Sequence, residues 1–185
     1  LGRSGDAELV FARRGEGTLH YAARLRYAPD DPAPAAMDQG FTVERTYTAE
    51  SGAPGGAFAA GTLVTVTLTL DVPKERRYVA VTDPLPAGFE PVESWFATTA
   101  ADLAAPPEDE SAPDWWERGG FDRVERHDDR VLLFATRLPE GRHVFSYLVR
   151  ATTAGRFTAA PARAEEMYAP EVFGRTAAAT VEVGR

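Results

Sequence analysis

The stretch "VTDPLPAGFEPV", residues 81–92, ends one apolar strand pattern and begins another. Pro84 lacks a backbone donor and pushes Asp83 into an extended conformation, so the strand should leave its hydrogen-bonded ladder at this point. Pro86 fixes φ for a turn, and Gly88 permits a left-handed or tight corner at low steric cost. The stretch therefore predicts a structural corner, at which the chain leaves one sheet and continues in another.

Alternation with a period of two residues on both sides of this corner predicts an all-β chain. In "TLVTVTLTLDV", residues 62–72, valine and leucine occupy one face and threonine the other, as in a half-buried antiparallel strand. We expect further strands, joined by short turns, at residues 78–81, 121–127, 130–137, 142–152 and 176–183. Because no helical period is sustained, the pattern predicts an antiparallel two-sheet β-sandwich, immunoglobulin-like in broad architecture.

Two stretches depart from this pattern. Residues 30–40 are rich in proline, alanine and aspartate, which indicates a linker or long loop. Residues 95–120 carry three prolines, many acidic residues and two adjacent tryptophans, which indicates an ordered surface excursion. Within it, Thr99–Ala104 is expected to form a short helical turn.

The composition excludes several classes of function. The chain has 185 residues, a net charge of −8 and a single lysine, Lys74, which disfavours nucleic acid and anionic membranes as partners. It has no cysteine, so no disulfide, thiolate zinc site, cysteine nucleophile or thioester can form within these residues. No apolar stretch is long enough to span a bilayer. Since neither a signal peptide nor an initiator methionine is present, we expect a piece of a longer protein.

No residues have the arrangement of a catalytic, cofactor or metal site. The histidines stand in separate expected strands, without the spacing of metal ligands, and are interpreted as ordinary surface or interface residues: His20, His127 and His143. None of the five serines lies in a nucleophile motif. Glu165, Glu166 and Glu171 could serve a glycosidase or a calcium site, but a solvated face is favoured. We therefore expect no enzymatic activity and no cofactor.

Aromatic residues supply the only candidates for interaction. Trp95, Trp115 and Trp116 could stack on a sugar or on a partner, although tryptophans that pin the excursion to the sandwich are favoured. We take these three tryptophans and Tyr168 as interaction candidates.

Four segments in a fixed order resemble one known family. They are "GEGTLHYAARLRYAP" (15–29), "FTVERTYT" (41–48), "VAVTDPLPAGFEPV" (79–92) and "DRVLLFATRLPEGRHVFSYLVRATTAGRFTAAPARAEEMYAPEVFGRT" (129–176). Together they resemble the carboxy-terminal end of the bacterial alpha-2-macroglobulin family of envelope proteins that trap proteases. The corner motif alone is weak, because many surface-repeat sandwiches carry a similar one; joined to the last segment it is fairly specific.

The resemblance implies a division of the chain. Residues 1–29 would be the tail strands of a CUB-like domain, with a hairpin turn at Arg14–Gly17, and residues 30–40 would be a linker. Residues 41–185 would form the carboxy-terminal, receptor-binding-type domain, a macroglobulin-like β-sandwich.

The resemblance also implies a function through a parent protein. The last domain would be non-catalytic, would pack on CUB-like and thioester-type domains, would shield the thioester, and would move when a protease cuts the bait region. Target proteases would be partners only through the parent, and the domain itself would be a monomer in the periplasm or at the cell surface. Animal relatives bind a clearance receptor through lysines, but residues 95–118 contain none, so no receptor site carries over. The alternatives are a repeat sandwich of a surface adhesin and, less favoured, a carbohydrate-binding or glycosidase module.

Overall fold

The fold is given by a computed structural model, which describes residues 9–23, 33–52, 54–92 and 119–185. The chain divides into two compact units, Leu1–Asp30 and Asp31–Arg185. All strands in the described ranges lie in the second unit, and those ranges contain no helix. Consequently, no described segment is a helix long and apolar enough to cross a membrane.

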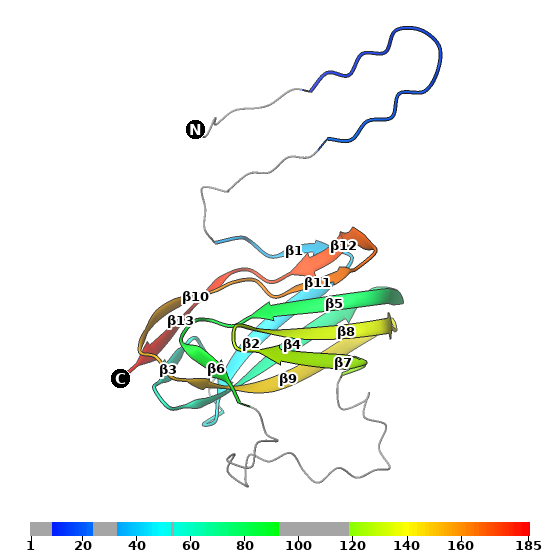
Figure 1. The fold of residues 1–185 in the computed structure, drawn as a ribbon. Coiled ribbons are helices and arrows are strands. Elements are labelled where there is room, and N and C mark those ends of the chain that lie inside the picture. The colour runs from blue at the N-terminus through cyan, green and yellow to red at the C-terminus, as the bar shows by residue number, and fades with distance from the viewer. Residues whose placement is uncertain (1–8, 24–32, 53, 93–118) are drawn as a thin grey trace. The chain divides into compact units, whose positions relative to one another are not determined.

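The largest sheet has six antiparallel strands in the order β1-β12-β11-β5-β8-β7, and it faces the viewer in Figure 1. Its strands are β1 (Met37–Gln39), β5 (Arg76–Pro84), β7 (Arg123–His127), β8 (Arg130–Leu138), β11 (Arg163–Glu166) and β12 (Ala169–Arg175).

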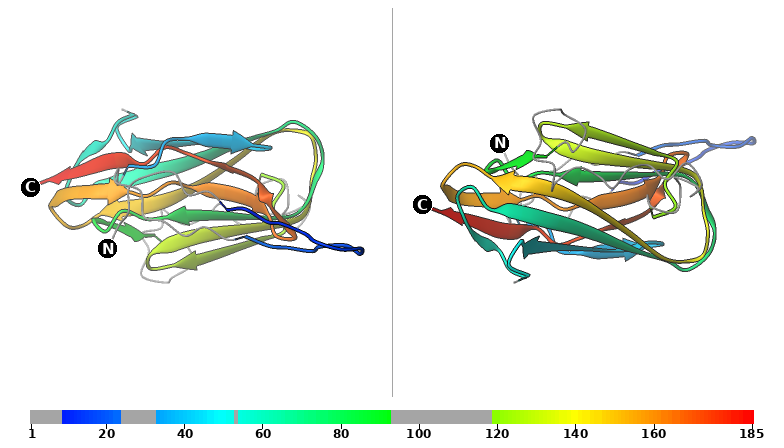
Figure 2. Two further views of the ribbon diagram at one scale, coloured as in Figure 1. Left: turned by 90° about the horizontal axis from the view of Figure 1, so that it is seen from above. Right: turned by 90° about the horizontal axis from the view of Figure 1, so that it is seen from below.

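A four-stranded antiparallel sheet, β2-β4-β9-β6, forms the second layer. Its strands are β2 (Thr42–Ala49), β4 (Leu63–Val72), β6 (Phe89–Pro91) and β9 (Gly141–Ala151). A small third sheet, β10-β13-β3, lies at the end of the sandwich that carries the C-terminus (Figure 2). Its strands are β3 (Ala57–Ala59), β10 (Gly155–Ala159) and β13 (Ala179–Gly184), and β13 pairs with β3 in parallel.

The core lies between the two large sheets, and β4 shows why the sequence folds this way. Val64, Val66 and Leu68 are completely buried, while the intervening threonines face outward. Val81 and Leu133 of the six-stranded sheet are also completely buried. Each such valine or leucine stabilises the fold by roughly 1.5–3 kcal/mol relative to an exposed side chain. The predicted antiparallel sandwich is thus confirmed.

One part of the expected linker forms a strand. Met37–Gln39, within the expected linker 30–40, forms β1 and pairs with β12, so that part of the linker prediction is wrong. All three residues are exposed, and an exposed edge strand shows no apolar alternation from which to predict it. The helical turn expected at Thr99–Ala104 lies outside the described residues. The third sheet was not predicted from the sequence, and its parallel pair joins segments that are far apart in the chain.

The proline-rich stretch at residues 84–88 joins the two layers. β5, which ends at Pro84, belongs to the six-stranded sheet, whereas β6, which begins at Phe89, belongs to the four-stranded sheet. The turn closes through a hydrogen bond of 2.9 Å from the Phe89 N–H to the Pro86 carbonyl. Gly88 does not adopt the left-handed conformation that was one of its expected roles. A side chain is excluded there because a Cβ on Gly88 would collide with the Phe157 ring.

Candidate interaction surface and its buried support

Of the aromatic interaction candidates, only Tyr168 falls within the described residues. Trp95, Trp115 and Trp116 lie in residues 93–118, outside the described ranges. Tyr168 stands in the turn between β11 and β12 and is 80% exposed. Exposure of this degree is uncommon for a large aromatic residue, which makes Tyr168 and its neighbours a candidate interaction surface.

Tyr168 belongs to a cluster of three exposed side chains, which we call the Tyr–Met patch: Tyr78, Met167 and Tyr168. Met167 is 51% exposed and Tyr78 is 49% exposed. The two tyrosine rings meet edge to face, with centroids 5.2 Å apart and an interplanar angle of 87°. Rings in this geometry attract each other, so the patch presents an ordered apolar surface to solvent. The sequence did not predict Tyr78 as a member, because it lies about 90 residues from Tyr168.

The backbone beneath the patch is held in an unusual conformation. Tyr78 has a φ of 51° and is the one residue other than glycine with a positive φ in the described ranges. This conformation costs roughly 1–2 kcal/mol for a residue with a side chain. A hydrogen bond of 2.8 Å from the Met167 N–H to the Tyr78 carbonyl joins the two segments. The pairing of β5 with β8 skips Tyr78. On β8, the Thr136 N–H donates to the Asp122 carboxylate at 2.5 Å.

Arg76 supports the patch from inside the sandwich. Its side chain is 9% exposed, and its Nη2 donates to the Gly40 carbonyl at 3.1 Å. Its Nη1 lies 3.6 Å from Oε1 of Glu166, the residue before Met167. The guanidinium also lies 5.4 Å from the centre of the Phe41 ring. Arg76, on β5, therefore links the residue after β1 to the end of β11 that leads into the exposed turn.

Asp83, predicted only as part of the corner, is the centre of a buried polar cluster. Its carboxylate is completely buried and accepts hydrogen bonds from Arg45 Nη1 at 2.5 Å and from the Tyr147 hydroxyl at 2.6 Å. Arg45 lies on β2 and Tyr147 on β9, so the cluster ties β5 of one sheet to two strands of the other. Arg45 Nη2 also donates to the Ala160 carbonyl at 2.8 Å.

The electrostatics of this cluster suit a structural support between the sheets. Burial raises the pKa of Asp83, while the Arg45 charge and the hydrogen bonds from Tyr147 and Arg45 oppose that rise. Burial and the Asp83 charge raise the pKa of Tyr147, which keeps its hydroxyl protonated as a donor. The sequence contained a signal for Arg45. In the period-2 alternation of β2, Arg45 occupies an inward-facing position between Val43 and Tyr47, which are both buried.

The glutamates and histidines that could suggest chemistry lie apart. Glu165 and Glu166 are successive residues of β11, and Glu171 is on β12; no group of three acidic or histidine residues in the described ranges could hold a metal ion. A cavity of about 510 Å³ lies beside His143, and its lining includes Asp122, Arg137 and Arg142. The two ring nitrogens of His143 face the carbonyl oxygens of Gly119 and Pro139, at 3.0 and 2.9 Å, which is a structural use of the ring.

The fold and sequence are similar to those of known proteins. The family model described as "Bacterial Alpha-2-macroglobulin MG10 domain" matches residues 40–171. An "Alpha-2-macroglobulin homolog" of Nostoc sp. is 31% identical over 94% of this chain. A "Circularly permutated Ras protein 2" of Dictyostelium discoideum is 27% identical over 92% of this chain, which covers 4% of that protein.

A solved structure shares the fold. The crystal structure of Salmonella alpha-2-macroglobulin reacted with methylamine is 25% identical, with a TM-score of 0.67 over 85% of this chain. This chain spans 9% of the length of the Nostoc relative and 10% of the Salmonella chain. It therefore corresponds to a small part of each of these proteins.

Proposed function

This chain belongs to the bacterial alpha-2-macroglobulin family, and we propose that it acts as a non-catalytic domain that docks on other domains of a much longer parent protein through the Tyr–Met patch. The observation that carries this proposal is the ordered exposure of Tyr168, which is 80% exposed yet held against Tyr78 on a strained backbone. Strained, well-supported residues tend to mark functional contacts. Tyrosine and methionine are also enriched at the cores of protein interfaces.

Within the parent, the proposed role of the patch is to cover the thioester before cleavage and to leave it afterwards. The patch is built from two aromatic rings and a thioether, which suits a cover that must exclude water and amines. The domain would then be displaced when a protease cuts the bait region. We propose that the chain acts in the periplasm or at the cell surface, in the carboxy-terminal, receptor-binding-type position of a protease inhibitor. The adhesin repeat and the carbohydrate module have no specific observation in their favour.

The first unit fits the same picture of a chain that works with neighbouring domains. Leu9, Val10 and Tyr21 are 70%, 78% and 66% exposed, and the rings of Phe11 and Tyr21 stack at 4.3 Å. Apolar side chains exposed to this extent are normally covered by a partner. We propose that residues 1–29 complete a CUB-like domain whose other strands are supplied by the parent.

The shielding role is tested in the full-length parent by thiol release after addition of methylamine. The variant Met167→Ala/Tyr168→Ala should release thiol about tenfold faster or more, because each interface residue of this kind contributes roughly 1 kcal/mol or more to docking. Val144→Ala serves as a matched control, since Val144 is an exposed apolar residue on the other sheet. Equal rates for the double variant and the unsubstituted parent, or no thiol release from either, would overturn the shielding role.

A further inference from the structure

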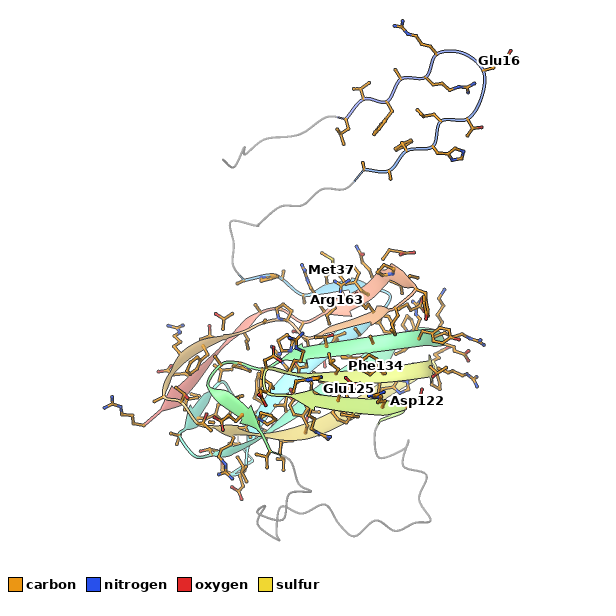
Figure 3. The ribbon with its side chains drawn as sticks, viewed as in Figure 1. Glu16, Met37, Asp122, Glu125, Phe134 and Arg163 are labelled. Atoms are coloured by element: carbon orange, nitrogen blue, oxygen red, sulfur yellow. The ribbon has the colours of Figure 1, made fainter. Side chains whose placement is uncertain are left out.

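The outer face of the six-stranded sheet carries two regular rows of side chains that run across the strands. Antiparallel register places cross-strand partners on the same face. The first row is Arg123, Phe134, Ala80, Glu165, Phe173 and Gln39. The second row is Glu125, Leu132, Thr82, Arg163, Arg175 and Met37. Figure 3 labels Met37, Arg163, Phe134 and Glu125 on this face.

The centre of this face is apolar and its flanks are charged. Phe134 and Leu132 on β8 are partly exposed and lie beside the small residues of β5. On one side, Arg123 and Glu125 of β7 form an ion pair of 2.8 Å. On the other side, Arg163 and Glu165 of β11 form a second ion pair, also of 2.8 Å. An apolar centre with a polar rim is the usual anatomy of a protein interface.

The guanidinium of Arg163 adds a feature typical of interface anchors. Its Cζ lies 4.1 Å from the centre of the Phe173 ring, while its Nη2 lies 2.8 Å from the Glu165 carboxylate. The stack and the ion pair hold the side chain in one orientation on the surface. An arginine ordered in this way loses little conformational entropy on binding, and arginine is one of the residue types that dominate interface energetics.

The outer face of the four-stranded sheet provides an internal comparison. Its cross-strand positions include Thr46 paired with Thr67, and Thr67 paired with Ser146. The hydroxyls of Thr67 and Ser146 are hydrogen-bonded to each other at 2.9 Å. The two outer faces thus differ at their centres: the four-stranded sheet has hydroxyls there, with the apolar Val144 and Leu148 on either side of Ser146, whereas the six-stranded sheet has phenylalanine and leucine.

We propose that the outer face of the six-stranded sheet, centred on Leu132 and Phe134, is the docking surface for another domain of the same parent chain. The surface of that partner domain would have an apolar centre with acidic residues around it. This inference rests on the proposed function, because the occupant belongs to the roughly nine-tenths of each relative's length that this chain does not span. The charge balance of this face indicates that the rim of the partner's surface is acidic. Across the paired positions of this face, four arginines oppose two glutamates and Asp129, which binds Arg130, so the face keeps a positive excess on a chain with a net charge of −8: Arg123, Arg130, Arg163 and Arg175 against Glu125, Asp129 and Glu165.

The area of the face is adequate for such a contact. Six strands at a spacing of about 4.8 Å, contributing about 17 Å of length on average, give a plane of roughly 400 Å². Counting both partners, the contact would bury about 800 Å², which is within the usual range of about 600–1,500 Å² for interfaces between domains of one chain.

Hydroxyl-radical labelling read by mass spectrometry tests this inference on the full-length parent and on the 185-residue chain. Labelling of Leu132, Phe134 and Phe173 should be about fivefold lower or more in the parent, because interface cores pack as densely as protein interiors. Val144, an exposed residue of the other sheet, is the reference. Phe134→Lys should restore labelling of Leu132 in the parent, whereas Thr46→Lys, an exposed position on the other outer face, should not.

The possible results separate the two proposals. Equal labelling of Leu132 and Phe134 in both proteins, with Met167 and Tyr168 protected in the parent, would overturn the docking face and leave the proposed function standing. Full labelling of all four residues in the parent would overturn both. Protection that appears in the 185-residue chain alone, and grows with its concentration, would identify a second copy as the occupant and overturn the inference.

Discussion

Replacing Arg45 by methionine should strongly destabilise the sandwich, because it leaves the Asp83 carboxylate buried without its cation. The two side chains are 3% and 1% exposed, and the Nη1–Oδ1 distance is 2.5 Å. Removing one member of a buried ion pair costs about 3–5 kcal/mol, most of it the cost of the unpaired charge left behind. Methionine keeps most of the length and packing of the arginine stem, so the electrostatic loss should dominate.

The size of this loss should depend on pH in a defined direction. Arg45 opposes the rise that burial causes in the pKa of Asp83, so removing Arg45 raises that pKa further in the folded state. The folded state of the variant then binds the proton more tightly than the unfolded state does. The contribution of Asp83 to stability is therefore full below its ordinary pKa of 3.8 and is lost as the pH rises through the raised value. The difference between the variant and the unsubstituted chain should shrink as the pH falls.

Urea unfolding of the 185-residue chain, followed by far-ultraviolet circular dichroism, measures this effect. With a slope of about 2 kcal/mol per molar urea, the midpoint at neutral pH should fall by roughly 1.5–2.5 M. Tyr147→Phe removes a single hydrogen bond to the same carboxylate and should cost about 1.5–3 kcal/mol, which keeps the test informative if Arg45→Met does not fold. Arg130→Met, which breaks an exposed ion pair with Asp129, is the control and should leave the midpoint unchanged. A loss below about 1 kcal/mol, or one that does not vary with pH, would refute the reasoning.

Two other substitutions test local features. Gly88→Ala should destabilise the sandwich by about 1–3 kcal/mol, since the new Cβ meets the Phe157 ring, and adding Phe157→Leu should recover part of the loss in the thermal midpoint; no loss would mean that the corner has room for a side chain. Asp38→Asn should have the opposite pH dependence to Arg45→Met. Hydrogen bonds from Thr42 and Gly40 lower the pKa of Asp38, so its contribution is present above its ordinary pKa of 3.8 and is lost as the pH falls through the lowered value. In urea titrations at several pH values, the variant should be less stable at neutral pH and equal to the unsubstituted chain in acid; a constant difference would contradict this.

The sequence predicted the elements that follow a strong alternation, and it missed those set by contacts between distant segments. The alternation of "TLVTVTLTLDV" places β4 within one residue of its observed start. β1 was missed because its pairing with β12 is all that makes it a strand. The position of Asp83 at a strand end was visible, but its partners Arg45 and Tyr147 lie 38 and 64 residues away, and only the packing of the two sheets brings them together.

The candidate surfaces follow the same rule. Tyr168 could be named from the sequence, but its exposure and its contact with Tyr78 depend on the pairing of β11 with β5. The outer face of the six-stranded sheet could not be recognised, because its two rows draw one residue from each of six strands whose order in space differs from their order in the chain. A single strand such as "VLLFA" shows only that both of its faces are apolar.

β5 is the element on which these features converge, and Arg76 shows whether they are coupled. Arg76→Met removes the hydrogen bond to Gly40 and the ion pair with Glu166, while the Tyr78 carbonyl remains the acceptor of the Met167 N–H. A hydrogen bond from a charged group contributes about 1.5–3 kcal/mol, so local opening of the turn should become roughly tenfold more frequent or more.

Amide hydrogen exchange of the 185-residue chain measures that opening, because exchange reports local unfolding residue by residue. The Met167 amide should exchange roughly tenfold faster or more in Arg76→Met, while Val81, which is completely buried nearer the Asp83 end of β5, should keep its protection. Arg137→Met breaks the exposed ion pair with Glu75, the residue before β5, and should change neither rate. Equal acceleration at Met167 and Val81 would mean that the sandwich opens as a whole. In that case the Tyr–Met patch would have no local support of its own, and its exposure would carry no argument for docking.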